Sequence, residues 1–198
     1  MDNSKEVIHP AWLRVAHWIN ALAVLVLITS GWKIYNATAF LGFAFPNDLT
    51  LGGWLGGALL WHFAAMWVLA INGTAYLVLN GVTKRLVTKF FPLSFKALVA
   101  DMGAALKGHL SHADPRQYNT VQRLAYLFVR LDSVLLVLSG LVLWKSVQFP
   151  LLRTLLGGYE GARLVHFFAM SGLVLFVIVH LVMVLLVPRT LLTMVRGR

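Results

Sequence analysis

Residues 163–180, RLVHFFAMSGLVLFVIVH, form an apolar run that holds two histidines fourteen residues apart, His166 and His180. On an α-helix, fourteen steps of about 100° bring the second histidine to within about 40° of the first and about 21 Å along the axis. Both imidazoles therefore face one interior, with one near each face of a hydrocarbon core about 30 Å thick. Ionisable side chains are costly to bury at membrane depth. The stretch predicts a transmembrane helix that holds two metal centres, one above the other.

The whole chain has the composition of an integral membrane protein. Of its 198 residues, 59% are hydrophobic and 12% are charged, with long apolar runs. The chain contains no cysteine, which excludes disulfides, thiolate-ligated clusters and covalent c-type haem, so a metal would need nitrogen or oxygen ligands. Histidine, with seven copies, is the best candidate. The net charge of +10 would fit binding to nucleic acid, but in a membrane chain an excess of Lys and Arg more often marks cytoplasmic loops beside anionic lipid headgroups, so no nucleic-acid partner is expected.

Four membrane spans are predicted, each close to the roughly 20 residues that a bilayer crossing needs. They cover residues 12–35, 52–79, 124–143 and 162–187. Most Lys and Arg residues outside the spans lie near the termini and in the long loop after the second span, so the positive-inside rule places both termini in the cytoplasm. The sequence predicts an all-α fold, an integral membrane four-helix bundle in a single domain of residues 1–198. Residues 94–110 of the long loop show the spacing of an amphipathic surface helix.

Four histidines lie within the predicted spans. The topology puts His17 and His180 near the cytoplasmic face, and His62 and His166 in the outer half. Two bis-histidine sites are therefore predicted, His17 with His180 and His62 with His166. Because lysines and arginines alone assigned the topology, the matching depths are separate support for this pairing. A hydrogen bond between helices is the alternative role for each histidine.

The ligand set favours haem over a bare metal ion. Zinc would want a third or fourth protein ligand, and copper or non-haem iron usually recruits carboxylates, which these depths do not offer. Haem b supplies four ring nitrogens and needs two axial ligands. Six-coordinate iron has no open position for a substrate, so the predicted chemistry is one-electron transfer.

Other polar residues near the spans are candidates for supporting roles. Arg14 and Arg163 each precede a histidine by three residues, on the same helix face and toward the aqueous end. They are predicted to bind haem propionates, and snorkelling to the interface is the alternative. Arg130 and Asp132 of the third span cannot face each other on one helix. A haem propionate, a proton path and a partner subunit all stay open as their partners.

Small residues recur in the first and third spans. A loose echo links LITSGW at residues 27–32 with VLSGLVLW at residues 137–144. Gly31, Gly140 and Gly172 are expected to let helices or a flat cofactor approach closely, and ordinary small-residue helix packing explains them equally well.

Several of these segments together resemble the bacterial di-haem cytochrome b561 superfamily. They are RVAHW in the first span, His62, the segment QYNTVQRLAY at residues 117–126, and the His166 and His180 pair. The superfamily includes the cytochrome b subunits of nickel-iron hydrogenases, formate dehydrogenases and thiosulfate reductases. The resemblance covers about residues 9–188 and implies two haem b groups and a location in the bacterial inner membrane. It also implies a quinone site, for ubiquinone or menaquinone, beside the cytoplasmic haem.

The resemblance further implies which residues contact the quinone. In formate dehydrogenase relatives the matching asparagine lies by the quinone, which corresponds to Asn119. Physically, a quinone carbonyl needs a hydrogen-bond donor of this kind. Gln122 is a second candidate, and a helix cap is the competing role for Asn119.

Two redox functions follow from this resemblance. The first is an electron-transfer subunit that relays electrons between the quinone pool and a periplasmic redox partner, for example a molybdenum-containing oxidoreductase. The alternative is an enzyme that resembles the superoxide oxidase branch and passes electrons from superoxide to ubiquinone. Cationic residues on the outer side would steer that anion inward or seat an acidic partner; they are Lys33, Lys145, Arg153 and Arg163. A channel or transporter would make the four histidines coincidental, and the chain lacks the broken helices in matching halves that such folds use.

Overall fold

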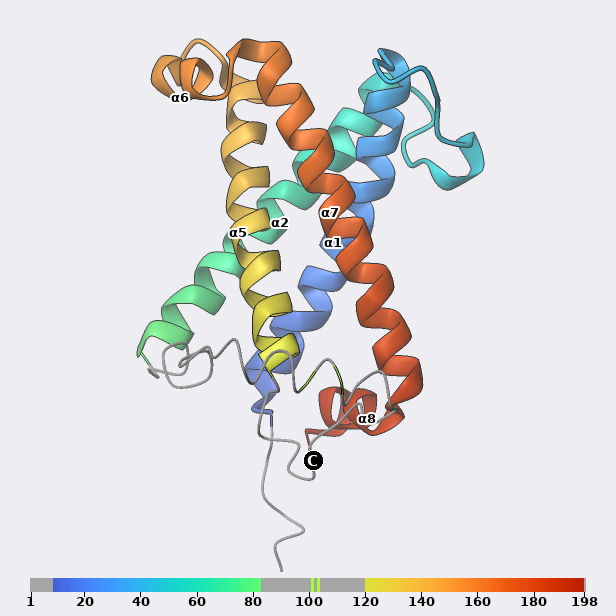
Figure 1. Cartoon of the computed structure of the whole chain (residues 1–198), viewed down its shortest axis with the longest axis vertical. Helices are drawn as coiled ribbons and strands as arrows, with labels where there is room; N and C mark the ends of the chain where they lie inside the picture. The colour runs from blue at the N-terminus through green and yellow to red at the C-terminus, as the bar shows by residue number, and fades with distance from the viewer. Residues whose placement is uncertain (1–8, 83–100, 102, 104–119, 198) are drawn as a thin grey trace, which may run out of the picture. The chain divides into compact units, whose positions relative to one another are not determined.

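The computed structural model describes residues 9–82, 101, 103 and 120–197. Within these residues the secondary structure is helical and contains no strand (Figure 1). The elements are α1 (Ala11–Ala37), the 3-10 helix η2 (Asn47–Leu49), α2 (Leu55–Val82), α5 (Thr120–Lys145), α6 (Pro150–Leu155), α7 (Gly158–Leu186) and α8 (Pro188–Arg196). The predicted all-α fold is confirmed.

Four of the helices are long and apolar enough to cross a membrane. They lie within α1, α2, α5 and α7 and each has between 25 and 29 residues, which exceeds the roughly 20 residues that a crossing needs. Large apolar side chains such as Leu22, Leu60, Leu131 and Leu185 point outward, where a bilayer would surround them. The prediction of an integral membrane protein with four spanning helices is confirmed.

The chain divides into two compact units. Unit 1 comprises residues 1–86 and 192–198, and unit 2 comprises residues 87–191. In unit 1, α1 packs against α2. The buried positions in these two helices are mostly alanines, namely Ala16, Ala23, Ala58 and Ala65. Small side chains let two helix backbones approach closely in a membrane, where packing rather than water exclusion holds helices together.

The second helix begins three residues later than predicted, at Leu55 instead of residue 52. Gly52 and Gly53 have φ angles of +111° and +70°. These positive φ angles suit glycine and do not occur in a right-handed helix, so α2 begins only after these two residues. A Cβ on Gly52 would also collide with the backbone of Ala58, so the chain turns tightly into α2 at this point.

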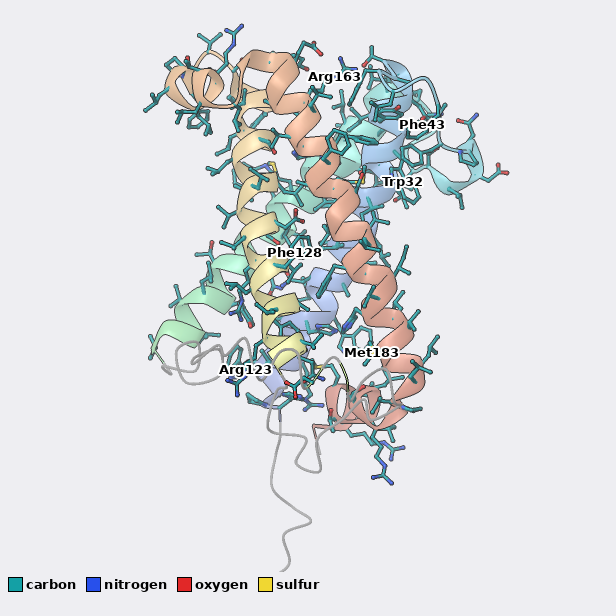
Figure 2. All side chains as sticks on the ribbon, in the orientation of Figure 1. Trp32, Phe43, Arg123, Phe128, Arg163 and Met183 are labelled. Atoms are coloured by element: carbon teal, nitrogen blue, oxygen red, sulfur yellow. The ribbon has the colours of Figure 1, made fainter. Side chains whose placement is uncertain are left out.

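An aromatic cluster orders the loop that follows α1. Trp32 stacks on Phe45 with ring centroids 4.8 Å apart, and Tyr35 contacts Phe43 at 5.3 Å. The Asn36 side chain accepts a hydrogen bond from the Phe45 amide and donates one to the Phe45 carbonyl, both at 2.8 Å. Figure 2 shows Trp32 and Phe43 at this end of α1. Aromatic side chains of this kind are typical of the boundary between membrane and water.

In unit 2, α5 packs against α7, and the short helix α6 contacts both. Figure 1 shows α6 at the end of the unit where α5 finishes and α7 begins. Ser139 and Val142 of α5 and Ala162 and Ala169 of α7 are buried. As in unit 1, small side chains line the packed face.

The C-terminal helix α8 was not predicted. Val187 leaves the helical conformation and Pro188 starts α8, as expected for a residue that has no amide hydrogen to donate. Leu191, Leu192 and Val195 are exposed, and Val195 follows the two leucines by four and three residues, so the three share one face of α8 and make it amphipathic and suited to a membrane surface. The amphipathic helix predicted at residues 94–110 lies outside the described residues, except for Asp101 and Gly103, which are helical.

Candidate functional site

In unit 1, His62 of α2 faces a serine and a glycine of α1. His62 lies about two turns into its helix. Its Nδ1 atom is 3.0 Å from Ser30 Oγ. A Cβ built on the neighbouring Gly31 would lie 3.6 Å from His62 Cε1. A Cβ at residue 31 would therefore make ordinary van der Waals contact with the imidazole, which packs directly against α1.

Unit 2 repeats this arrangement with different helices. His166 lies about two turns into α7, and its Nδ1 atom is 2.9 Å from Ser139 Oγ on α5. A Cβ on Gly140 would lie 3.3 Å from His166 Cε1, which is tighter than ordinary contact. The echo between residues 27–32 and 137–144 therefore corresponds to a shared Ser-Gly pair that holds a histidine of the next spanning helix.

These contacts fit an imidazole that serves as a metal ligand. Histidines that bind metals usually use one ring nitrogen for the metal and hydrogen-bond through the other. In His62 and His166 the serine engages Nδ1, so Nε2 is the nitrogen suited to an iron atom. Among the described residues, no three His, Cys, Asp or Glu side chains lie together as a metal cluster. A cofactor that brings its own equatorial ligands, as haem does, suits such isolated imidazoles.

The other two intramembrane histidines contact aromatic rings. His17 in α1 meets Trp18 edge to face, with ring centroids 5.4 Å apart. His180 in α7 stacks on Phe176 at 5.9 Å with an interplanar angle of 11°. His17 belongs to unit 1 and His180 to unit 2. Both predicted pairings join the two units, and they stay predictions.

Asn72 of α2 links the two helices of unit 1 beside His17. Its Nδ2 group donates to the Ala16 carbonyl at 2.8 Å and to Asn20 Oδ1 at 2.7 Å. Ala16 is the neighbour of His17 in the chain, so this link fixes the backbone that carries the histidine. Neither asparagine was predicted as part of the site; an amide side chain in each of two apolar spans is the signal that could have indicated them.

The two arginines predicted to bind propionates each have a protein partner. Arg163 Nη1 is 3.0 Å from Glu160 Oε2, one turn earlier in α7. Figure 2 shows Arg163 at the end of unit 2 opposite Arg123. Arg14 Nη1 donates to the Val195 carbonyl at 2.6 Å. Arg14 Nε is buried and has no hydrogen-bond partner among the described residues, so a donor is left for an anionic group.

Asp132 is a buried carboxyl in the middle of α5. It is 8% exposed, and its Oδ2 atom has no hydrogen-bond partner in the described part of the chain. Its Oδ1 atom lies 3.4 Å from where a Cβ on Gly172 would be. Gly172 thus leaves room for the side chains of Phe128 and Asp132 on α5. Of the predicted quinone residues, Gln122 lies in the first turn of α5 and Asn119 lies outside the described residues.

A family model for prokaryotic cytochrome b561 matches residues 8–197. The chain belongs to the prokaryotic cytochrome b561 family. As a cytochrome b561 it is a membrane electron-transfer protein of a family that binds haem b, and its four spans make it a multi-pass bacterial membrane protein. The resemblance stated from the sequence is confirmed.

Two curated relatives of this cytochrome b561 cover most of its length. One relative, from Azospira oryzae, is named a putative protein-methionine-sulfoxide reductase subunit, YedZ1. It is 63% identical to this chain, and the match covers 98% of this chain and 99% of the relative's length. Another relative, from Cupriavidus necator, is named a probable Ni/Fe-hydrogenase B-type cytochrome subunit. It is 27% identical to this chain, and the match covers 87% of this chain and 76% of the relative's length. No solved structure matches this chain.

Proposed function

We propose that this cytochrome b561 is a di-haem subunit that passes electrons from the quinone pool of the bacterial inner membrane to a periplasmic protein-methionine-sulfoxide reductase. The repeated Ser-His contact carries the haem part of the proposal, because two imidazoles in different units are held by Nδ1 in the same way. The partner is proposed from the name of the Azospira oryzae relative, a putative protein-methionine-sulfoxide reductase subunit that is 63% identical to this chain. Reduction of a sulfoxide consumes two electrons and two protons, so electrons would leave this protein toward the partner.

The proposed haem ligands lie at two depths in the membrane. His62 and His166 would hold the outer haem, and His17 and His180 the cytoplasmic one, as their depths along each helix predict. Haem b supplies reversible one-electron chemistry when bound. Arg14 and Arg163 are the proposed propionate partners. A guanidinium has five N–H donors in a planar fork that suits a carboxylate, and Arg14 uses one of them on the Val195 carbonyl.

The protein's own residues would orient the ligands and exclude water. Ser30 and Ser139 hold two imidazoles, and Asn72 fixes the backbone beside a third. The apolar surfaces of α1, α2, α5 and α7 keep water and substrates away from the ligands. Asn119 and Gln122 are the proposed donors to a quinone carbonyl on the cytoplasmic side, beside the level of His17 and His180.

The proposal is tested with protein purified from haem-replete bacteria. We expect a b-type reduced-minus-oxidised spectrum, two haems per chain by pyridine haemochrome, and reduction of both haems by a quinol. The reduced haems should be reoxidised by a purified periplasmic protein-methionine-sulfoxide reductase that is supplied with an oxidised protein substrate. Colourless protein would overturn the proposal. Rapid haem reduction by superoxide, followed by ubiquinone reduction without any partner, would favour the superoxide oxidase alternative.

A further inference from the structure

We propose that Ser30 and Ser139 are positioning residues that set the tautomer of His62 and His166 and thereby lower the reduction potential of the outer haem. The inference rests on the proposed function, because it assumes that these two histidines bind iron. It adds two residues and a physical effect that the ligand assignment alone does not contain.

The single hydroxyl hydrogen of each serine is directed to a backbone carbonyl of its own helix. Ser30 Oγ lies 2.5 Å from the Val26 carbonyl oxygen, and Ser139 Oγ lies 2.7 Å from the Leu135 carbonyl oxygen. Two oxygen atoms this close require a hydrogen between them. A carbonyl has no hydrogen to give, so each serine donates its hydroxyl hydrogen to the carbonyl one turn earlier.

The position of this hydrogen decides how each serine oxygen interacts with its histidine. With its hydrogen directed to the carbonyl, each serine oxygen acts as an acceptor toward the imidazole. The contacts of 3.0 Å and 2.9 Å to Nδ1 are then N–H···O hydrogen bonds with ordinary lengths. His62 and His166 are therefore protonated at Nδ1, and the lone pair that can bind iron is on Nε2.

The surroundings of the serines make this hydrogen bond difficult to replace. Ser30 and Ser139 are both 0% exposed, so bulk water is not available as a substitute acceptor.

The same device occurs twice, in separate units. In each case the serine lies about two turns before the end of a spanning helix, is followed by glycine, and meets a histidine about two turns into the next spanning helix. Two independent instances with matching distances argue against a chance contact. His17 and His180, the other proposed ligands, belong to the level that these serines do not reach.

A hydrogen bond accepted from Nδ1–H affects the iron through the ring. It gives the imidazole partial imidazolate character, which stabilises ferric iron more than ferrous iron. The reduction potential of that haem falls as a result, since hydrogen bonding to an axial ligand is one of the levers on haem potential. Removing the serine oxygen should therefore raise the potential of the outer haem and leave the other unchanged.

The test is a redox titration of the purified holoprotein, with haem content measured for each sample. The variants are Ser30→Ala, Ser139→Ala and the double variant. Two matched controls lose a hydroxyl that also bonds to the carbonyl one turn earlier but makes no hydrogen bond to a histidine among the described residues: Thr29→Ala in α1 and Ser133→Ala in α5. We expect each serine variant to shift one midpoint potential upward, the double variant to shift that same potential further, and both controls to shift neither.

Each other outcome has a definite meaning. Two bound haems with unchanged potentials in all serine variants, or equal shifts in the controls, would overturn the inference and leave the proposed function standing. Wild-type protein without haem would overturn both. If Ser30→Ala and Ser139→Ala shifted different haems, the serine role would hold and the pairing of His62 with His166 would be wrong. If a serine variant lost one haem, Ser139→Thr or Ser30→Thr should restore it, because threonine keeps the hydroxyl; failure to restore it would count against the inference.

Discussion

Arg14 on α1 donates a 2.6 Å hydrogen bond to the backbone carbonyl of Val195, near the end of α8. The His9 amide also donates to the Gly197 carbonyl, at 3.4 Å. The guanidinium satisfies a carbonyl that α8 leaves without a helical partner, and its charge suits the negative end of the helix. These two hydrogen bonds hold residues 195–197 against the start of α1, so the C-terminal segment of unit 1 lies beside the first turn of its first helix.

Gly197→Ala should loosen this junction. Gly197 has a φ of +84°, and a Cβ there would lie 3.2 Å from Arg14 Cζ and from the His9 carbonyl oxygen. The left-handed conformation alone costs a non-glycine residue about 1–2 kcal/mol. Hydrogen-deuterium exchange at His9 and at residues 193–197 should speed up. Gly42→Ala is the control, since Gly42 has a φ of +75° and no atom within 4 Å of its Cβ position; faster exchange at the chain end in that variant would contradict the junction.

Gly172→Ala should destabilise the packing of α5 against α7. The new methyl group would lie 3.2 Å from Phe128 Cζ and 3.4 Å from Asp132 Oδ1. Overpacking of this kind costs about 1–3 kcal/mol. Thermal unfolding in detergent measures the loss. Gly73→Ala in α2 has open space at its Cβ position and should be neutral or stabilising by up to about 1 kcal/mol; similar losses in both variants would show that the Gly172 contacts do not matter.

Asn72→Ala should weaken the association of α1 with α2. It removes both hydrogen bonds from Nδ2, whereas Asn20→Ala removes one and leaves the bond to the Ala16 carbonyl. Polar links between membrane helices are worth about 0.5–2 kcal/mol, so Asn72→Ala should be the more damaging of the two. A double-mutant cycle on unfolding free energies measures the coupling. Thr74→Ala, whose hydroxyl bonds within α2, is the control, and additive effects of the two asparagines would refute the link.

His166→Ala should remove one haem and His180→Ala the other. The two side chains lie on one helix, about 21 Å apart along its axis, and would serve different levels. Pyridine haemochrome counts and spectra of the two variants measure the loss, with one haem expected in each. Loss of both haems from either single change would contradict independent sites.

Several features were predictable because they depend on local sequence and on the bilayer. The four spans follow from apolar run length, and the helices extend at most a few residues beyond the predicted bounds except at Gly52, where backbone conformation delays α2. The family also followed from short segments such as RVAHW and from intramembrane histidines. Helix α8 was missed because its nine residues are too short for a span and follow an apolar run directly.

The contacts that define the candidate site were not predictable in the same way. Ser30 and His62 are 32 residues apart, and Ser139 and His166 are 27 apart. The sequence suggested a similarity between the two Ser-Gly pairs without indicating what they contact. The two propionate candidates were selected by spacing from histidines, and their contacts with Val195 and Glu160 came from the structure.

The sequence by itself determined that this protein is a four-span member of the cytochrome b561 family with four histidines in its spanning helices. The bilayer imposes a fixed length and a polarity pattern on every span, and both can be read from the chain in order. Only the tertiary structure decided which serine meets which histidine and which ring nitrogen it engages. That depends on the rotation and register of two packed helices, which the small and large side chains of both helices set together.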